Sequence, residues 1–331
     1  MRYIIIGAGA VGLALSAEFE RAGVDYLLIG RGAQLEKLKA DGLTYERPGG
    51  TQILRLDLSD RADLRKDDIL LLTVKTQDAE AALDFWADQP VKGGGRGADL
   101  PVVTFQNGLD AERSALRRFA RVYAASILIP AVYIEAGRVS VFSGPQLASV
   151  VVGRFPAGRD AISARIVADL TRANSLAEER DDIRRWKSAK LLHNVRNVLE
   201  LFAGDAATLE LTARRITDEA RLALVAAGHD PARPDERLVD ISGWKVTRAQ
   251  STSPTGQSTW QSFTRGARSE VGYLNGEIAL LGALHGVDTP WNRAAQRLAA
   301  ELATSGGAPG SIAITRLVEL AGPDASLRAA S

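Results

Sequence analysis

The sequence predicts an α/β protein in which a doubly wound parallel sheet at the N-terminus is followed by an all-helical domain. Three observations lead to this fold class. Apolar runs alternate with helical periodicity through the first half, a glycine-rich turn lies between the first strand and helix, and strand signals end after AEERDDIRR. At 331 residues the chain is too long for one ordinary core. We therefore expect two domains, residues 1–178 and 179–331.

The elements of the first domain follow from apolar runs and their spacing. Tyr3–Ile6 is a short apolar run that suits a buried strand, and Ala10–Ala22 carries apolar residues at helical intervals until Gly23 ends it. The same patterns predict four further strands, at Tyr26–Ile29, Asp68–Val74, Pro101–Phe105 and Val122–Ile129. They also predict a helix at Ala79–Trp86, an antiparallel extension of the sheet at Leu147–Val152 and a closing helix at Asp160–Arg172.

Composition excludes several classes of function. Lysine and arginine total 41 against 40 acidic residues, so the net charge of +1 provides no field that would recruit nucleic acid or an anionic membrane. The absence of cysteine excludes disulfides, thiol nucleophiles and thiolate metal sites, and the three histidines show no metal-ligand spacing. We expect a small-molecule partner and no metal. The sequence leaves the oligomeric state open, a homodimer included.

The N-terminal apolar stretch is the one candidate for a targeting segment. Residues 3–17 contain three glycines and are shorter than the roughly 20 residues that a membrane span requires. This stretch therefore predicts neither a signal peptide nor a membrane anchor. A chain without cysteine is compatible with a reducing compartment, and we expect a cytoplasmic protein.

The segment IGAGAVG has the G-x-G-x-x-G spacing of a Rossmann-type dinucleotide site. Gly7 permits a tight turn, Gly9 lets a pyrophosphate approach the backbone, and Gly12 allows the helix to pack closely on the strand. The motif opens the chain directly between a predicted strand and a predicted helix, which favours dinucleotide binding over a merely structural turn. The expected cofactor-binding residues of this turn are Gly7, Ala8, Gly9, Ala10, Val11 and Gly12.

The end of the second strand indicates which dinucleotide binds. NAD enzymes usually place an acidic residue there for the ribose 2′-hydroxyl, but this chain reads LLIGRG, with Gly30 and Arg31 at that position. An arginine can instead bind a 2′-phosphate, so NADP(H) is favoured over NAD; an exposed loop arginine is the alternative. The missing carboxylate also counts against a methyltransferase, because that class usually binds the ribose in the same way.

Two more polar segments follow predicted strands at the sheet edge where open α/β folds bind ligands. They are VKTQD, which contains Lys75, and FQNGL, which contains Asn107. Their polar side chains could hydrogen-bond the nicotinamide or its ribose. Residues of the same types also form ordinary turns, and residue type alone does not separate the two interpretations.

The helical half contains a polar stripe in WKSAKLLHN. At 100° per residue, Trp186, Lys190, Asn194 and Asn197 share one face, with leucines and valines on either side of it. A solvated lysine on an amphipathic helix is the ordinary interpretation, since most lysines are exposed. A catalytic role for Lys190 needs support from the rest of the chain.

Taken together, IGAGAVG, LIGRG, VKTQD, FQNGL and WKSAKLLHN, with the late segment STWQSFTRGARSEVGYLNGEIALLGALHGVDTP, make the chain resemble the ketopantoate reductase family. The resemblance spans residue 7 to about residue 290. It implies a Rossmann domain, a helical domain, and NADPH-dependent reduction of 2-dehydropantoate to (R)-pantoate, a step of pantothenate biosynthesis.

The resemblance also implies a role for individual residues. It makes Lys190 the general acid and Glu270 the family glutamate, which acts in catalysis and near the cofactor. Asn194, Asn197, Ser258 and Asn107 become substrate-binding residues, Asn107 also lying near the nicotinamide. Lys75 and Arg31 become cofactor-binding residues, Arg31 through the 2′-phosphate.

The chemistry of ketone reduction supports Lys190 independently of the resemblance. Hydride addition to a ketone carbon leaves negative charge on the oxygen, so the site needs a donor that can transfer its proton there. Partial burial lowers the pKa of a lysine toward working pH. A lysine without a competing histidine or tyrosine pattern is therefore a reasonable general acid.

Two positions depart from the family pattern. The family's second asparagine lies eight residues after the lysine, where this chain has Val198 and places Asn197 one residue earlier. Gly272 stands where the family commonly has an acidic residue. One alternative is an NADP-dependent reductase or dehydrogenase of the same family acting on another 2-keto or 2-hydroxy acid. Another is a nucleotide sensor that binds NADPH without turnover.

Overall fold

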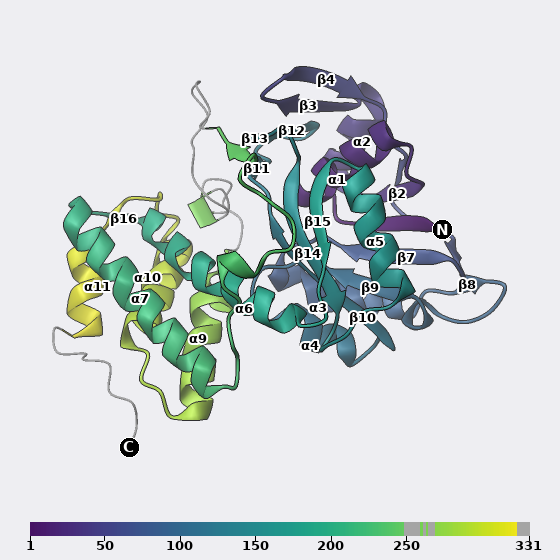
Figure 1. The fold of residues 1–331 in the computed structure, drawn as a ribbon. Coiled ribbons are helices and arrows are strands. Elements are labelled where there is room, and N and C mark those ends of the chain that lie inside the picture. Colours follow the sequence, from purple (N-terminus) through teal and green to yellow (C-terminus); the bar gives the residue numbers. More distant parts are fainter. Residues whose placement is uncertain (248–258, 261–262, 264–268, 323–331) are drawn as a thin grey trace. The chain divides into compact units, whose positions relative to one another are not determined.

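The computed structural model describes residues 1–247, 259–260, 263 and 269–322. These residues divide into two compact units, each with its own core. The first unit comprises the described residues of Met1–Gln106, Ala111–Ile183 and Pro234–Thr255, and the second those of Asn107–Asp110, Arg184–Arg233 and Gly256–Ser331. Figure 1 shows the strands of the first unit and the helices of the second.

An eight-stranded sheet forms the centre of the first unit. Its strand order is β15-β14-β10-β9-β7-β1-β2-β5, and all pairs are parallel except β10 with β14. The chain order reverses at β1, which makes the sheet doubly wound, and β14 is the predicted antiparallel extension. The strands are β1 (Arg2–Ile6), β2 (Tyr26–Ile29), β5 (Leu58–Ser59), β7 (Asp68–Leu72), β9 (Pro101–Thr104), β10 (Arg121–Leu128), β14 (Ala148–Arg154) and β15 (Ser175–Glu179).

Helices cover both faces of this sheet because its central strands are apolar on both sides. In β1, Tyr3 and Ile5 belong to one core cluster and Ile4 and Ile6 to another. The first cluster includes residues of α1 (Ala10–Ala22) and α5 (Ala161–Arg172), and the second includes residues of α3 (Thr76–Ala87) and α4 (Asp110–Leu116). The predicted alternation of strands and helices is therefore confirmed as a three-layer fold.

A smaller sheet, which the sequence analysis did not predict, joins the first unit. Its order is β11-β12-β3-β4, with bounds β3 (Leu43–Arg47), β4 (Gly50–Leu54), β11 (Ala131–Val132) and β12 (Arg138–Val141). The buried carboxylate of Glu18, on α1, accepts hydrogen bonds from Tyr45 Oη at 2.7 Å and Arg47 Nη1 at 2.6 Å. These bonds hold β3 against α1. Two-residue strands and short 3₁₀ helices complete the unit: β6 (Leu64–Arg65), β8 (Val91–Lys92), β13 (Ser143–Gly144), β17 (Lys245–Val246), η1 (Gly97–Asp99) and η3 (Pro234–Glu236).

The first unit extends past the boundary that we expected between residues 178 and 179, which falls inside β15. The charged residues around this boundary belong to a strand of the sheet and do not form a linker between domains. Buried Glu178 accepts hydrogen bonds from the backbone N–H groups of Leu238 and Val239 at 2.6 and 2.9 Å, so residues 234–247 return to the first unit. A strand with acidic residues was missed because its carboxylates are satisfied by a distant segment.

The second unit is built from helices around one apolar core. Two short strands, β16 (Phe202–Ala203) and β18 (Ile312–Ala313), pair with each other. Within the described residues, no helix is long and apolar enough to cross a membrane. The helices of the second unit are α6 (Ile183–Asn194), η2 (Val195–Leu201), α7 (Ala206–Ala226), α9 (Val271–His285), α10 (Pro290–Ser305) and α11 (Ile314–Ala321). The first unit also contains the helix α2 (Gly32–Asp41).

Candidate functional site

The three motif glycines occupy three different environments. Gly7 has a φ of +117°, and a Cβ there would lie 2.8 Å from Val74 Cγ1. At Gly12 a Cβ would lie 2.0 Å from the carbonyl oxygen of Gly7, so only glycine lets α1 pack this closely on the turn. A Cβ at Gly9 would meet nothing within 4 Å. Two of these glycines are therefore required by the fold, whereas the space beside Gly9 remains open to a ligand.

Neighbouring strands hold the glycine turn in place. Thr73, directly after β7, directs its hydroxyl to the carbonyl oxygens of Ile6 at 3.0 Å and Gly7 at 2.9 Å. Gln106 Nε2 donates to the carbonyl oxygens of Leu72 and Val74 at 2.9 and 2.8 Å. The Gln106 amide nitrogen therefore supports the end of β7. Thr73 was not singled out from the sequence, because a threonine at a strand end carries no distinctive spacing.

The start of α1 suits a bound anion. Gly9 is its N-cap, no side chain caps the helix, and its first turn contains no acidic residue. The first N–H groups of a helix have no partner within the helix, and the helix dipole favours negative charge beside them. Together with the open space at Gly9, these features fit the pyrophosphate of a dinucleotide.

Two basic residues follow strands of the same sheet. Arg31 lies two residues after β2 and is the N-cap of α2, with an exposed side chain. Among the described residues, Arg31 makes no side-chain hydrogen bond or ion pair. Lys75 follows β7, is half-buried, and is the N-cap of α3. Both residues lie beyond the carboxyl ends of parallel strands, where doubly wound folds bind their ligands.

The predicted catalytic and substrate-binding residues of the second unit lie next to residues of one apolar core. Each is followed within two positions by a residue of the same apolar cluster: Asn107 by Leu109, Lys190 by Leu191, Asn194 by Val195, Asn197 by Val198 and Glu270 by Val271. Side chains anchored next to a shared core have fixed positions relative to one another. Ser258 lies outside the described residues.

Gly108 fixes the Asn107 segment against α9. Its φ is +85°, and a Cβ there would lie 2.6 Å from the carbonyl oxygen of Tyr273. Tyr273 is three residues from Glu270, the N-cap of α9, and its N–H donates to the Glu270 carbonyl at 2.8 Å. The backbone beside Asn107 therefore lies next to the first turn that Glu270 begins.

Burial differs among these residues. Lys190 is half-buried, whereas Lys187, on the same helix, is 2% exposed. Asn194 and Asn197 are 3% and 5% exposed, yet neither side chain hydrogen-bonds to another residue in the described part of the chain. Buried polar groups are normally hydrogen-bonded. The part of the chain that the structure describes therefore satisfies neither amide, which makes both amides candidates for contact with a polar ligand.

A buried polar network, missed by the sequence analysis, crosses the helical core. Asn275 Nδ2 donates to the carbonyl oxygen of Val195 at 3.0 Å and to Asn292 Oδ1 at 3.1 Å. Asn292 Nδ2 donates to Glu219 Oε2 at 2.9 Å, and Glu219 also accepts from the backbone N–H groups of Trp291 and Asn292. The sequence feature that could have indicated this network is Asn275 itself, an asparagine among the apolar residues of α9.

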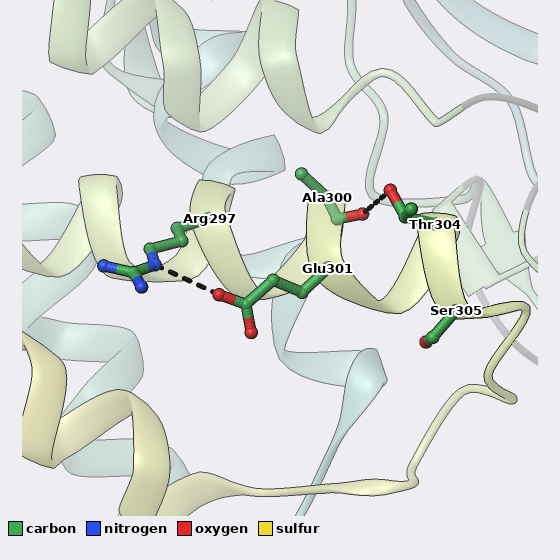
Figure 2. Close-up of a pocket in the computed structure, with 5 residues that line it drawn as sticks. All are labelled: Arg297, Ala300, Glu301, Thr304 and Ser305. Carbon is green, nitrogen blue, oxygen red and sulfur yellow. Dashed lines mark hydrogen bonds and ion pairs between the residues drawn. The ribbon is translucent and has the colours of Figure 1, made fainter.

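The second unit also has a surface depression, whose lining residues are none of the residues described above. Figure 2 shows that five residues of α10 line it: Arg297, Ala300, Glu301, Thr304 and Ser305. Arg297 pairs with Glu301 at 3.0 Å, and Thr304 donates to the Ala300 carbonyl at 2.9 Å. These are ordinary contacts between residues four positions apart on one helix, and no sequence-predicted site residue takes part.

Comparison with known proteins links both halves of the chain to one family. The family model "Ketopantoate reductase PanE/ApbA" matches residues 3–157, and the C-terminal model of the same family matches residues 182–303. A 2-dehydropantoate 2-reductase of Archaeoglobus fulgidus is 29% identical over 303 residues, which covers 88% of this chain and 94% of the relative.

Solved structures show the same fold. A PanE/ApbA family ketopantoate reductase from Ralstonia eutropha gives a TM-score of 0.74 at 23% identity, covering 92% of this chain and 99% of the other. D-mandelate dehydrogenase, in a ternary structure with NADH and anilino(oxo)acetate, gives 0.75 at 19% identity with the same coverage. The two family models together span most of the sequence, and the chain belongs to the ketopantoate reductase family.

Proposed function

We propose that this protein is an NADPH-dependent oxidoreductase that reduces 2-dehydropantoate to (R)-pantoate, a reaction that serves pantothenate biosynthesis. The observation that carries the proposal is that both units match the ketopantoate reductase family, over residues 3–157 and 182–303. The open backbone at Gly9 supports it because it fits a dinucleotide. The buried amides of Asn194 and Asn197, which bond to no other described residue, support it because they fit a polar substrate.

The cofactor is assigned to the first unit. The turn residues Gly7 to Gly12 and the N-terminus of α1 would hold the pyrophosphate, and Lys75 would contact the nicotinamide half. Arg31 would bind the 2′-phosphate, which favours NADPH over NADH. When bound, the reduced nicotinamide supplies a hydride to the keto carbon of the substrate.

The second unit supplies the proton. In the proposed reaction the Lys190 ammonium donates a hydrogen bond to the keto oxygen and transfers its proton as the carbonyl π bond breaks. The product is a 2-hydroxy acid, and the neutral amine is reprotonated from solvent. General acid catalysis of this kind contributes roughly 10²–10⁴-fold in rate. Glu270 would hold Lys190 or a substrate hydroxyl.

The remaining polar residues orient the substrate. Asn194 and Asn197 offer amide donors and acceptors from a buried face, and Asn107 offers another from a segment fixed by Gly108. Ser258 is assigned to the substrate carboxylate. Oriented binding of this kind converts an encounter between two molecules into a reaction within one complex.

A second candidate is the reduction of a different 2-keto acid, or oxidation of the matching 2-hydroxy acid. Two observations favour it: the similar fold of D-mandelate dehydrogenase and the displacement of the second asparagine from position 198 to 197. Both affect the substrate half and leave the cofactor and the hydride transfer unchanged.

The test is a steady-state comparison of keto acids. Purified protein is assayed with NADPH and with NADH against 2-dehydropantoate, benzoylformate, 2-ketoisovalerate and 3,3-dimethyl-2-oxobutanoate, which lacks the 4-hydroxyl of dehydropantoate. We expect the highest kcat/KM with NADPH and 2-dehydropantoate. Equal or faster turnover of benzoylformate would select the second candidate, and NADPH binding without turnover of any keto acid would indicate a nucleotide sensor.

A further inference from the structure

The polar stripe of α6 continues into an unusually long 3₁₀ helix. The α-helix ends at Asn194, and the next seven residues form η2, Val195–Leu201. Runs of 3₁₀ helix longer than three or four residues are uncommon, because their hydrogen-bond geometry is poorer than that of an α-helix. A switch of winding directly between Asn194 and Asn197 therefore needs a cause and has a consequence for both side chains.

The consequence is a change in where Asn197 lies. Residues three apart eclipse each other in a 3₁₀ helix, so the ideal geometry of η2, which starts directly after Asn194, brings Asn197 into line with Asn194. An α-helix would rotate Asn197 by about 60° away from Asn194 and place it about 4.5 Å along the axis. Three residues of 3₁₀ helix advance about 6 Å, which is as far as four residues of α-helix.

The two asparagines that this winding aligns are both buried. Both asparagines are at least nine-tenths buried, and within the described residues neither amide has a protein partner. The next residue along, Val198, is buried in the apolar core. The winding therefore separates two amides on one face from an apolar residue that packs into the core.

Asn275 contacts the winding switch at its first residue. Its amide donates to the carbonyl oxygen of Val195 at 3.0 Å, and a side chain that enters a helical ladder changes the local winding. Asn275 is fully buried, and its second N–H is held by Asn292, which is held in turn by Glu219. Its orientation is therefore fixed from α10 and α7.

We propose that Asn275 is a positioning residue: by binding the Val195 carbonyl it holds residues 195–201 in the 3₁₀ form and so aligns the Asn197 amide with Asn194 for the substrate. Asn275 acts through these asparagines and does not itself touch the substrate. The inference rests on the proposed function for the identity of that substrate, a 2-keto acid.

A double-mutant cycle tests this coupling. Asn275→Ala and Asn197→Ala, alone and combined, are assayed with NADPH and the best keto acid. Each single variant is expected to lower kcat/KM by about 10–100-fold, since small misplacements of a binding group have effects of this size. The double variant is expected to lose no more than the worse single variant, with the Kd of NADPH within about twofold. Losses that multiply would overturn the proposal.

Leu317→Ala is the matched control for stability. Leu317 is a fully buried residue of the same core, on α11, and it lies outside η2 and carries no polar group that could bind the Val195 carbonyl. The control is expected to lower the melting temperature while keeping kcat/KM near that of the wild type in the folded range. If it lowers kcat/KM as much as Asn275→Ala does, Asn275 has only a structural role.

Moving the amide gives a second test. Asn197→Val combined with Val198→Asn shifts the asparagine by one residue, which in a 3₁₀ helix carries it about 120° away from Asn194. We expect activity no better than that of Asn197→Val alone. Wild-type activity in the shifted variant would show that the winding does not place the amide.

A crystal structure of the Asn275→Ala variant tests the inference without any assay. Residues 195–201 are expected to adopt an α-helix in it, and an unchanged 3₁₀ helix would overturn the proposal. This readout separates the two hypotheses: a wild-type protein that turns over no keto acid contradicts the proposed function, whereas the winding of η2 decides the role of Asn275.

Discussion

Lys190 is the single side chain on which the proposed proton transfer depends. Replacement by methionine keeps much of its apolar length and removes the ammonium group. We expect Lys190→Met to lower kcat by about 10²–10⁴-fold, the usual contribution of a general acid, while the Kd of NADPH changes little. Single-turnover rates with the best keto acid, together with NADPH titration, measure both quantities.

Lys187 provides the comparison within the same helix. Lys187 is more deeply buried than Lys190 and lies off the polar stripe, although it is only three residues away in the sequence. Lys187→Met therefore removes a nearby amine without changing the stripe. If Lys187→Met loses turnover at full cofactor affinity while Lys190→Met keeps it, the general acid has been assigned to the wrong lysine.

The glycine turn predicts opposite effects for two similar substitutions. Gly12→Ala places a methyl group 2.0 Å from the Gly7 carbonyl oxygen, so we expect a loss of about 1–3 kcal/mol of stability or more. Gly9→Ala meets no atom within 4 Å and keeps a φ of −90°, which any residue adopts. We expect a stability change below about 1 kcal/mol but weaker NADPH binding, by about tenfold or more. Urea unfolding and cofactor fluorescence measure the two effects, and unchanged affinity in Gly9→Ala would place the pyrophosphate elsewhere.

Arg31 is expected to determine the choice between the two nicotinamide dinucleotides. Charge-assisted hydrogen bonds contribute about 1.5–3 kcal/mol, so Arg31→Ala should raise the Kd of NADPH by about 10–100-fold and leave that of NADH nearly unchanged. Arg55→Ala is the control, because the Arg55 guanidinium is already bound to the carbonyl oxygens of Lys39 and Ala40. Equal losses for both dinucleotides would mean that Arg31 does not read the 2′-phosphate.

At the scale of single elements, α5 shows how one cap couples stability to pH. Asp160 accepts hydrogen bonds from the N–H groups of Ile162 and Ser163 at 2.9 and 3.1 Å and from Tyr123 Oη at 2.7 Å. Burial works to raise the pKa of Asp160, but these hydrogen bonds outweigh it, with that from Tyr123 the largest, and hold the pKa below its ordinary value.

Asp160→Ala is therefore expected to lower the free energy of unfolding by about 1–2 kcal/mol at neutral pH. Because the folded-state pKa is lowered, the contribution of the ionised carboxylate is present above the ordinary value of about 3.9 and is lost as the pH falls through the lowered pKa. Urea unfolding at pH 7, 5 and 3 should show the difference from wild type shrinking at the lowest pH. Asp218→Ala, at an exposed mid-helix position of α7, is the control for removing a carboxylate that caps no helix, and it should change stability at pH 7 by less than about 0.5 kcal/mol.

Elements with a clear apolar period could be predicted from the sequence, and those held by distant polar partners could not. The helix Ala10–Ala22 and the strand Tyr26–Ile29 have the predicted bounds, because buried residues in a doubly wound sheet leave an unbroken apolar run. The strand Ser175–Glu179 was missed, since Glu178 is acidic and its partners lie about 60 residues further on.

In the candidate site, too, features with a local sequence pattern could be predicted and features held by distant residues could not. The glycine turn has a local geometry, so its spacing alone indicates the fold around Gly9. The switch to 3₁₀ winding after Asn194 has no local signal, because it accompanies a bond from Asn275, 80 residues away. For the same reason the position of the second asparagine is a departure from the family pattern when only the sequence is considered. With ideal 3₁₀ geometry, Asn197 advances along the axis about as far as an α-helical residue 198 would.

At the scale of the whole molecule, the apolar core of the second unit is separate from those of the first, which predicts separable effects on stability and cofactor binding. Leu317→Ala leaves a cavity in the helical core and should lower stability by about 2–5 kcal/mol. The residues proposed to bind the pyrophosphate and the 2′-phosphate, Gly7 to Gly12 and Arg31, lie in the first unit, so the Kd of NADPH should stay within about twofold of wild type. Calorimetry with and without NADPH measures both effects, and a large loss of affinity would show that the helical core also supports the cofactor site.

The return of residues 234–247 to the first unit limits how this protein can be recombined with its relatives. Glu178 and β13 receive partners from Leu238, Val239 and β17, so the Rossmann half is not one continuous stretch of chain. A chimera joined at residue 183 would present a foreign surface to this returning segment and leave a buried carboxylate without its donors. Transplanting coenzyme preference between family members therefore requires the returning segment to move with the first 183 residues.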